Sequence, residues 1–125
     1  VRAVVHAHPI FATTLTVADL EFPVDVLPEV LLTLGDVPTT KYATPASHED
    51  AEVIRPFFYT LNAMLLRQHG SLTYGKHLDE ALIHLERIEH VSEIYWRAKM
   101  LGEVKRVPED AQAKLIALRE AYFKG

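Results

Sequence analysis

The sequence predicts a mixed α/β fold, and two features indicate it. Short apolar runs bounded by glycine, proline or polar residues are typical of buried strands, and they lie at residues 2–7, 62–68 and 71–74. Apolar side chains recur at helical spacing between residues 78 and 101, which predicts one long amphipathic helix. We therefore expect short strands that are covered by helices.

Proline and glycine mark the ends of further helices. Pro9 suits the first turn of a helix over residues 10–18, because its missing N–H costs nothing there. Gly102 is a natural stop for the long helix. Pro108 begins a last helix that should run to about Tyr122.

The region between the first helix and Ser47 carries mostly loop signals. Residues 19–28 and 35–46 are rich in proline and polar residues, and we predict loops there, with one strand near residues 40–42. Residues 30–34 fit either a short strand or a helical turn, and the sequence does not choose between them.

Ser47 is a good N-cap, and two acidic residues follow it in what would be the first turn of a helix. We predict that this helix runs to about Leu61. Pro56 lies inside it and should kink or interrupt it, because proline has no N–H to donate to the preceding turn.

The long helix is expected to supply much of the core. Its predicted buried face consists of Leu78, Ala81, Leu82, Leu85, Ile88, Ser92, Tyr95 and Ala98. Tyr95 and Trp96 are predicted as core residues. Glu86 and Glu89 flank the apolar stripe, so one of them is expected to be partly buried and paired, whereas the simpler alternative is a solvated face.

Composition limits the class of protein. The chain has 125 residues, enough for one domain spanning residues 1–125, and 49% of them are hydrophobic, which favours a folded chain over a disordered one. The net charge is −4 with no cluster of Lys and Arg, which disfavours nucleic acid or an anionic membrane as a partner. The chain has no cysteine, which fits a reducing cytoplasm, and no apolar run of membrane-spanning length.

The segment that ends in His6-Ala7-His8-Pro9 carries the clearest chemical signal. Residues two apart on a strand project to the same face, about 6–7 Å apart, so both imidazoles can bind one ion. His69 ends a second apolar run. Three neutral imidazoles with an open position are typical of a catalytic zinc site. Spacing alone leaves open a structural role for these histidines.

Four further histidines have a simpler interpretation. We expect them on loops or helix surfaces, with one packed in the core; they are His48, His77, His84 and His90. The five glycines do not form a loop that could bind a phosphate group, and no Ser/His/Asp order suggests a nucleophilic triad.

Several motifs together resemble the class II aldolase/adducin-head family. They are His6-Ala7-His8-Pro9 with Ala12-Thr13, then Leu65-Leu66-Arg67-Gln68-His69-Gly70, Gly75 and Glu80-Ala81. The resemblance covers nearly the whole chain. It implies an α/β/α fold with a largely antiparallel central sheet flanked by helices, and a homo-oligomer, usually a tetramer, with sites between subunits.

The resemblance also assigns residues. It implies that His6, His8 and His69 bind Zn²⁺ or another divalent metal, which in this family stabilises the enediolate formed when a ketose phosphate is cleaved. Tyr122 could match a terminal tyrosine that donates a proton at the neighbouring subunit's site. A second family tyrosine falls near Leu27, where this chain has none, so the resemblance leaves the sugar open.

The family's acid/base glutamate and phosphate pocket would lie upstream of Val1. We therefore expect a C-terminal portion of the family domain, incomplete at the N-terminus, which alone binds metal without cleaving its substrate at an enzymic rate. The implied activity is cleavage of a sugar phosphate such as L-fuculose 1-phosphate to dihydroxyacetone phosphate and an aldehyde. The alternatives are an epimerase or dehydratase of the same family, or a non-catalytic adducin-like interaction module.

Overall fold

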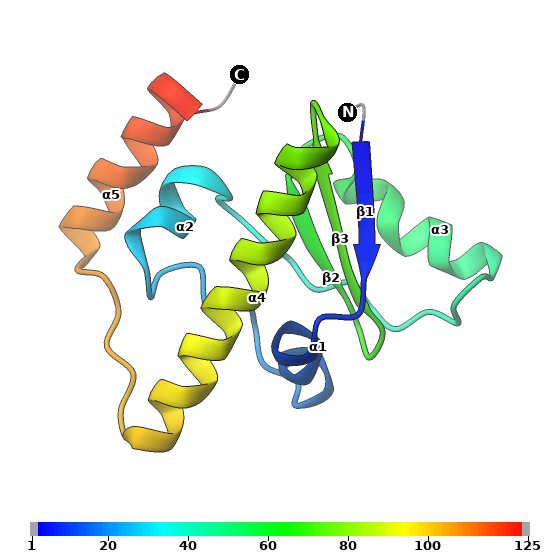
Figure 1. Cartoon of the computed structure of the whole chain (residues 1–125), viewed down its shortest axis with the longest axis horizontal. Coiled ribbons are helices and arrows are strands. Elements are labelled where there is room, and N and C mark those ends of the chain that lie inside the picture. The colour runs from blue at the N-terminus through cyan, green and yellow to red at the C-terminus, as the bar shows by residue number, and fades with distance from the viewer. Residues whose placement is uncertain (1–2, 124–125) are drawn as a thin grey trace.

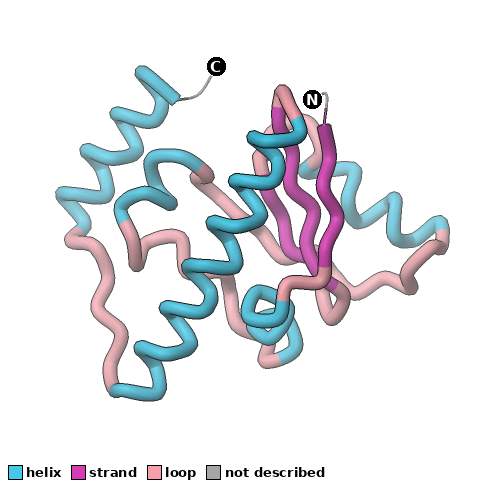
Figure 2. Tube along the Cα trace, in the orientation of Figure 1, coloured by secondary structure: helices cyan, strands magenta, loops and turns pink. Residues whose placement is uncertain are grey.

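The computed structural model describes residues 3–123 as short strands with helices on either side (Figures 1 and 2). The elements in chain order are β1 (Ala3–Ala7), α1 (Ile10–Val17), α2 (Pro28–Thr33), α3 (His48–Ile54), the 3₁₀ turn η1 (Arg55–Phe57), β2 (Ala63–Leu66), β3 (Gly70–Gly75), α4 (Leu78–Leu101), α5 (Glu109–Leu118) and the π-helical turn η2 (Arg119–Phe123). The predicted mixture of strands and helices is confirmed.

The three strands form one antiparallel sheet in the order β1-β3-β2. β3 is central, and its first half pairs on both sides: Ser71 lies opposite Ala7 in β1 and opposite Leu65 in β2. β2 is shorter than the run predicted at residues 62–68, because the chain turns at residues 67–69 instead of continuing the strand.

Helices cover both faces of this sheet, with α4 on one side and α3 on the other (Figure 1). Successive residues of β2 serve the two faces, since Leu65 belongs to the core cluster with Ile88 of α4, whereas Met64 packs with Tyr74 and Phe58 near η1. All four residues of β2 are buried for this reason. The expected α/β/α layering is confirmed.

The long helix has the predicted bounds, and its buried face agrees with the predicted one at Ala81, Ile88, Ser92 and Tyr95. Its buried residues are Ala81, His84, Ile88, Val91, Ser92 and Tyr95. Leu78 and Leu82, predicted to be buried, are 63% and 43% exposed. His84 takes a core position because its Nδ1–H donates to the carbonyl oxygen of Tyr74 at 2.7 Å, which satisfies a polar group that burial would otherwise penalise.

Trp96 also departs from the prediction of a core residue. It is 39% exposed and packs edge-on against Phe11 of α1, with ring centroids 5.6 Å apart. Tyr95, by contrast, is buried as expected. The contact between Phe11 and Trp96 joins α1 to the second half of α4.

The helix that follows Ser47 is shorter than predicted. α3 ends at Ile54, and the chain continues as the 3₁₀ turn η1, whose second residue is Pro56. Proline therefore interrupts the helix as expected, and the predicted continuation to Leu61 is wrong, because Pro56 cannot donate the helical hydrogen bond.

Two further predictions are resolved by the structure. Residues 30–34, left open by the sequence, lie in and just after the helix α2. The strand predicted near residues 40–42 is absent; a single parallel bridge joins Thr39 to Leu65 instead. In the described part of the chain, no helix is long and apolar enough to cross a membrane.

The burial of Tyr74 should make the unfolding free energy decrease as the pH rises in alkaline solution. Burial raises the pKa of this tyrosine to about 12. A tyrosine in the unfolded chain ionises near pH 10, so the unfolded state loses its proton first. The stability present below about pH 10 should therefore decrease as the pH rises toward about 12. Urea unfolding across this range should show a smaller decrease for Tyr74→Phe; parallel curves for the two proteins would contradict the prediction.

Candidate metal centre

Three histidines from two distant parts of the sequence meet at one end of the sheet. His6 lies on β1, His8 follows the end of that strand, and His69 lies in the turn between β2 and β3. The potential ligand atoms of all three lie within 4.8 Å of one another. The structure therefore brings together the three residues that the sequence predicted as ligands.

His6 and His8 point to the same side because the alternation of β1 continues past its last residue. Along residues 3–8 the exposure alternates, with His6 and His8 both exposed. Nδ1 of His6 lies 2.9 Å from the carbonyl oxygen of Ser71, and a carbonyl only accepts, so Nδ1 carries the proton. This bond leaves Nε2 of His6 free to bind a metal, the usual role of such an outer partner.

The distance between the two imidazoles suits a shared ion. Nε2 of His8 lies 3.2 Å from Nε2 of His6. Two nitrogens bound to zinc at about 2.0–2.1 Å in tetrahedral geometry are about 3.3 Å apart. The third ring is equally near, since the centroid of His69 lies 4.8 Å from that of His6 and 5.0 Å from that of His8. These residues fit a divalent ion.

The turn that carries His69 is held against α1. Gln68 has a positive φ of 54°, which reverses the chain direction after β2. Its backbone N–H donates to Oγ1 of Thr16 at 3.0 Å. Arg67 makes an ion pair with Asp19, just after α1. These contacts fix the turn from the side of the helix and orient His69 toward the other two histidines.

Gly70 allows the close approach of the two histidine segments. A Cβ at this position would lie 2.3 Å from the carbonyl oxygen of Ala7 and 2.7 Å from Cδ2 of His8. Contacts this short do not occur between non-bonded atoms, so any side chain would push the segments apart. Only glycine lets β3 begin beside His8.

Burial and the two neighbouring imidazoles favour the neutral, metal-binding form of His69. Burial lowers the pKa of His69, and the nearby His6 and His8 lower it further, while Asp50 acts in the opposite direction. A lowered pKa means that the neutral imidazole, which is the form that binds metal, persists to lower pH. The exposure of His6 and His8 leaves the site open to a ligand.

Comparison with known proteins places this chain in a family. The model of the family "Class II Aldolase and Adducin N-terminal domain" matches residues 1–96. The chain belongs to this family. The predicted resemblance is thereby confirmed.

Its relatives include sugar-phosphate aldolases. A 5-deoxy-D-ribulose 1-phosphate aldolase of Bacillus thuringiensis is 28% identical over 123 residues, covering 98% of this chain and 57% of its own length. An L-fuculose phosphate aldolase of Haemophilus influenzae is 32% identical over 109 residues, covering 86% of this chain and 49% of its own length. This chain thus spans about half the length of these relatives.

A solved structure shows the same fold. The structure of an L-fuculose 1-phosphate aldolase superposes with a TM-score of 0.80 at 27% identity, covering 91% of this chain and 53% of that one. The arrangement of the sheet and its helices is therefore that of the class II aldolase fold.

The remaining histidines of this chain do not belong to the three-histidine cluster. His84 is the one packed in the core, where it binds the carbonyl of Tyr74. His48, His77 and His90 are exposed, as expected. Tyr122 is 79% exposed and lies in η2 near the C-terminus, so it is available for contact with another molecule.

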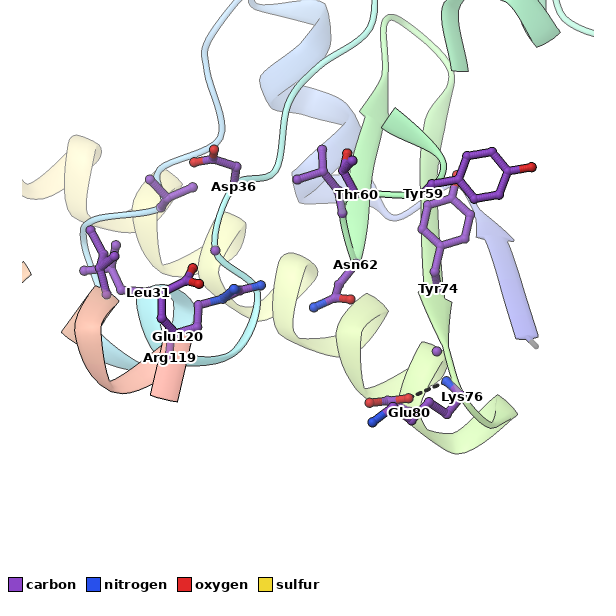
Figure 3. Close-up of a pocket in the computed structure, with 15 residues that line it drawn as sticks. Leu31, Asp36, Tyr59, Thr60, Asn62, Tyr74, Lys76, Glu80, Arg119 and Glu120 are labelled. Atoms are coloured by element: carbon purple, nitrogen blue, oxygen red, sulfur yellow. Dashed lines mark hydrogen bonds between the residues drawn. The ribbon is translucent and has the colours of Figure 1, made fainter. Parts of the chain in front are cut away.

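The structure also contains a cavity that the sequence did not predict. A cavity of about 560 Å³ lies between η2 and the end of β3 that is remote from Gly70 (Figure 3). Its charged and amide-bearing lining residues are Asp36, Asn62, Lys76, Glu80, Arg119 and Glu120. Apart from Arg119 and Glu120, which are neighbours in η2, they come from separate parts of the chain and have no common spacing, so the sequence carried no signal for the cavity.

Replacing Gly70 with alanine should disturb both stability and metal binding. The added Cβ would force the carbonyl of Ala7 and the ring of His8 to move. We expect a loss of about 1–3 kcal/mol in unfolding free energy, typical of overpacking. Urea unfolding and zinc titration measure the two effects. The neighbouring variant Ser71→Ala adds no atoms and should leave both nearly unchanged; equal behaviour of the two variants would contradict the role of Gly70.

Proposed function

We propose that this chain forms the metal-binding part of a class II aldolase-type lyase. The proposed reaction cleaves a ketose phosphate, such as L-fuculose 1-phosphate, to dihydroxyacetone phosphate and an aldehyde. The observation that carries the proposal is the convergence of His6, His8 and His69, whose ligand atoms lie within 4.8 Å of one another. Aldolases of sugar phosphates among the relatives support the reaction class.

The donor set favours zinc. Three neutral imidazoles with room for a further ligand are typical of catalytic zinc sites, although imidazole also suits cobalt and nickel. When bound, such an ion supplies Lewis-acid catalysis by polarising a carbonyl group. In this proposal His6, His8 and His69 hold the ion, Ser71 orients His6 through its carbonyl, and Thr16 orients the turn of His69.

Tyr122 is the proposed proton donor. Its exposure in η2 fits a side chain that reaches the metal site of a neighbouring subunit, and we propose a homo-oligomer, a tetramer, in which this contact forms. Its hydroxyl must come within about 2.6–3.2 Å of the reacting atom, directly or through one water. Light scattering at micromolar concentration tests the assembly; a monomer would argue against it.

Metal binding is the direct test of the proposed site. Protein purified without added metal and titrated with Zn²⁺ should bind one ion per chain. His69→Ala removes one ligand and should lower the affinity by more than the roughly 10–100-fold typical of losing an outer-shell partner. Isothermal titration with elemental analysis measures both the affinity and the number of ions.

His77→Ala is the matched control for this experiment. His77 is an exposed histidine at the other end of the sheet, next to the start of α4, so its loss should leave zinc affinity unchanged. Absence of any bound divalent ion, or equal affinity of His69→Ala and His77→Ala, would overturn the proposal.

Tyr122→Phe tests the proton donor. The assay follows dihydroxyacetone phosphate release by a polypeptide of the relatives' length that contains these residues. We expect kcat to fall by about 10²–10⁴-fold, the usual contribution of general acid–base catalysis, with KM little changed. Tyr42→Phe alters another exposed tyrosine and should keep full turnover. Unchanged turnover in Tyr122→Phe would reject the assigned role.

A further inference from the structure

The start of α1 is capped from a distant part of the chain. Its N-cap residue is Pro9, which makes no side-chain capping bond. The backbone N–H of Phe11 donates to Oε1 of Glu89 at 2.8 Å, and that of Ala12 donates to Oε2 at 3.0 Å. A single carboxylate of α4 thus satisfies two first-turn amides that would otherwise have no partner.

The helix α1 contacts both segments that carry the candidate ligands. Its first residue, Ile10, is separated from His8 by Pro9 alone. Near its other end, Oγ1 of Thr16 accepts a hydrogen bond from the backbone N–H of Gln68, the neighbour of His69. A displacement of α1 would therefore move His8 at one end and the turn of His69 at the other.

We infer that Glu89 is a positioning residue for the candidate metal centre and acts through α1. The inference rests on the proposed metal site and adds a residue to it that is not a ligand. Glu89 is half-buried and lines a shallow hollow with His8, Pro9 and Glu86 beside the site. Its carboxylate binds backbone amides, so it acts on the histidines only by fixing where α1 begins.

A carboxylate suits this position better than an amide. Each of its two oxygens accepts one of the two N–H groups, and its negative charge interacts favourably with the positive end of the helix. A glutamine side chain offers one accepting oxygen, and its NH₂ group would face the second N–H donor. Glu89→Gln keeps the shape of the side chain and removes half of the capping contact.

Zinc affinity and the cobalt spectrum provide the test. Outer-shell partners of metal ligands typically contribute about 10–100-fold in affinity. We expect Glu89→Ala to weaken Zn²⁺ binding about tenfold and to change the visible spectrum of the Co²⁺-loaded protein, with Glu89→Gln showing a smaller change of the same kind. The control is Glu93→Gln on the same helix, which removes an exposed ion pair with Arg97 and should match the wild-type chain.

A second control separates positioning from general stability. Phe58→Leu reduces packing in the cluster on the other side of the sheet, remote from α1, and should lower the unfolding free energy without altering zinc affinity. If Phe58→Leu weakens zinc binding as much as the Glu89 variants at equal loss of stability, Glu89 has only a structural role and the inference is overturned.

Imidazole NMR signals of the metal-free chain give a readout that does not depend on metal binding. In Glu89→Gln the ring signals of His8 and His69 should shift, whereas that of His84, buried against β3, should not. Thr16→Val removes the contact to Gln68, together with the bond that the hydroxyl donates to the carbonyl of Thr13, and should shift His69 but not His8. Unchanged His8 and His69 signals in Glu89→Gln would overturn the inference even in a wild-type chain that binds zinc. Failure of the wild-type chain to bind any ion would instead overturn the proposed function, and with it the role of Glu89 at a metal centre.

Discussion

Antiparallel pairing between β1 and β3 is the constraint on which the candidate metal centre depends. The pairing sets His6 opposite Leu72 and Ala7 opposite Ser71, so that two segments far apart in the sequence run side by side. The carbonyl of Ser71 then orients His6, and the missing side chain of Gly70 lets the segments meet. A slip of one residue would turn His6 to the opposite face of the sheet, so the site is a consequence of the register.

Polar groups of α4 complete the arrangement by binding the backbone of other elements. His84 donates to the carbonyl of Tyr74, Glu89 accepts two N–H groups of α1, and the carbonyl of Ala81 accepts from the hydroxyl of Thr73. Two of these contacts join α4 to β3, and the contact of Glu89 joins it to α1. Since buried polar groups are costly without partners, these bonds specify one position of α4 over the sheet.

Periodicity and end signals in the sequence predicted the helices whose bounds are set by residues close together in the chain. The bounds of α4 followed from its helical periodicity and the stop at Gly102, and α1 followed from Pro9. The convergence of the three histidines was also predicted, because residues two apart on a strand share a face and the motifs resembled a known family. Trp96 was misplaced because spacing along one helix does not show which neighbouring elements are present to cover it.

The sequence by itself determined the three strands, the helices α1 and α4, and the three histidines whose side chains could share an ion. Only the tertiary structure decided that His84 would be buried in place of Leu82, because the cost of burying an imidazole depends on whether a carbonyl such as that of Tyr74 lies within reach. The same holds for Glu89, whose two partners lie on α1. Hydrogen bonds between distant elements follow no periodic pattern along the chain. They therefore cannot be predicted from the sequence pattern and become visible only in the folded structure.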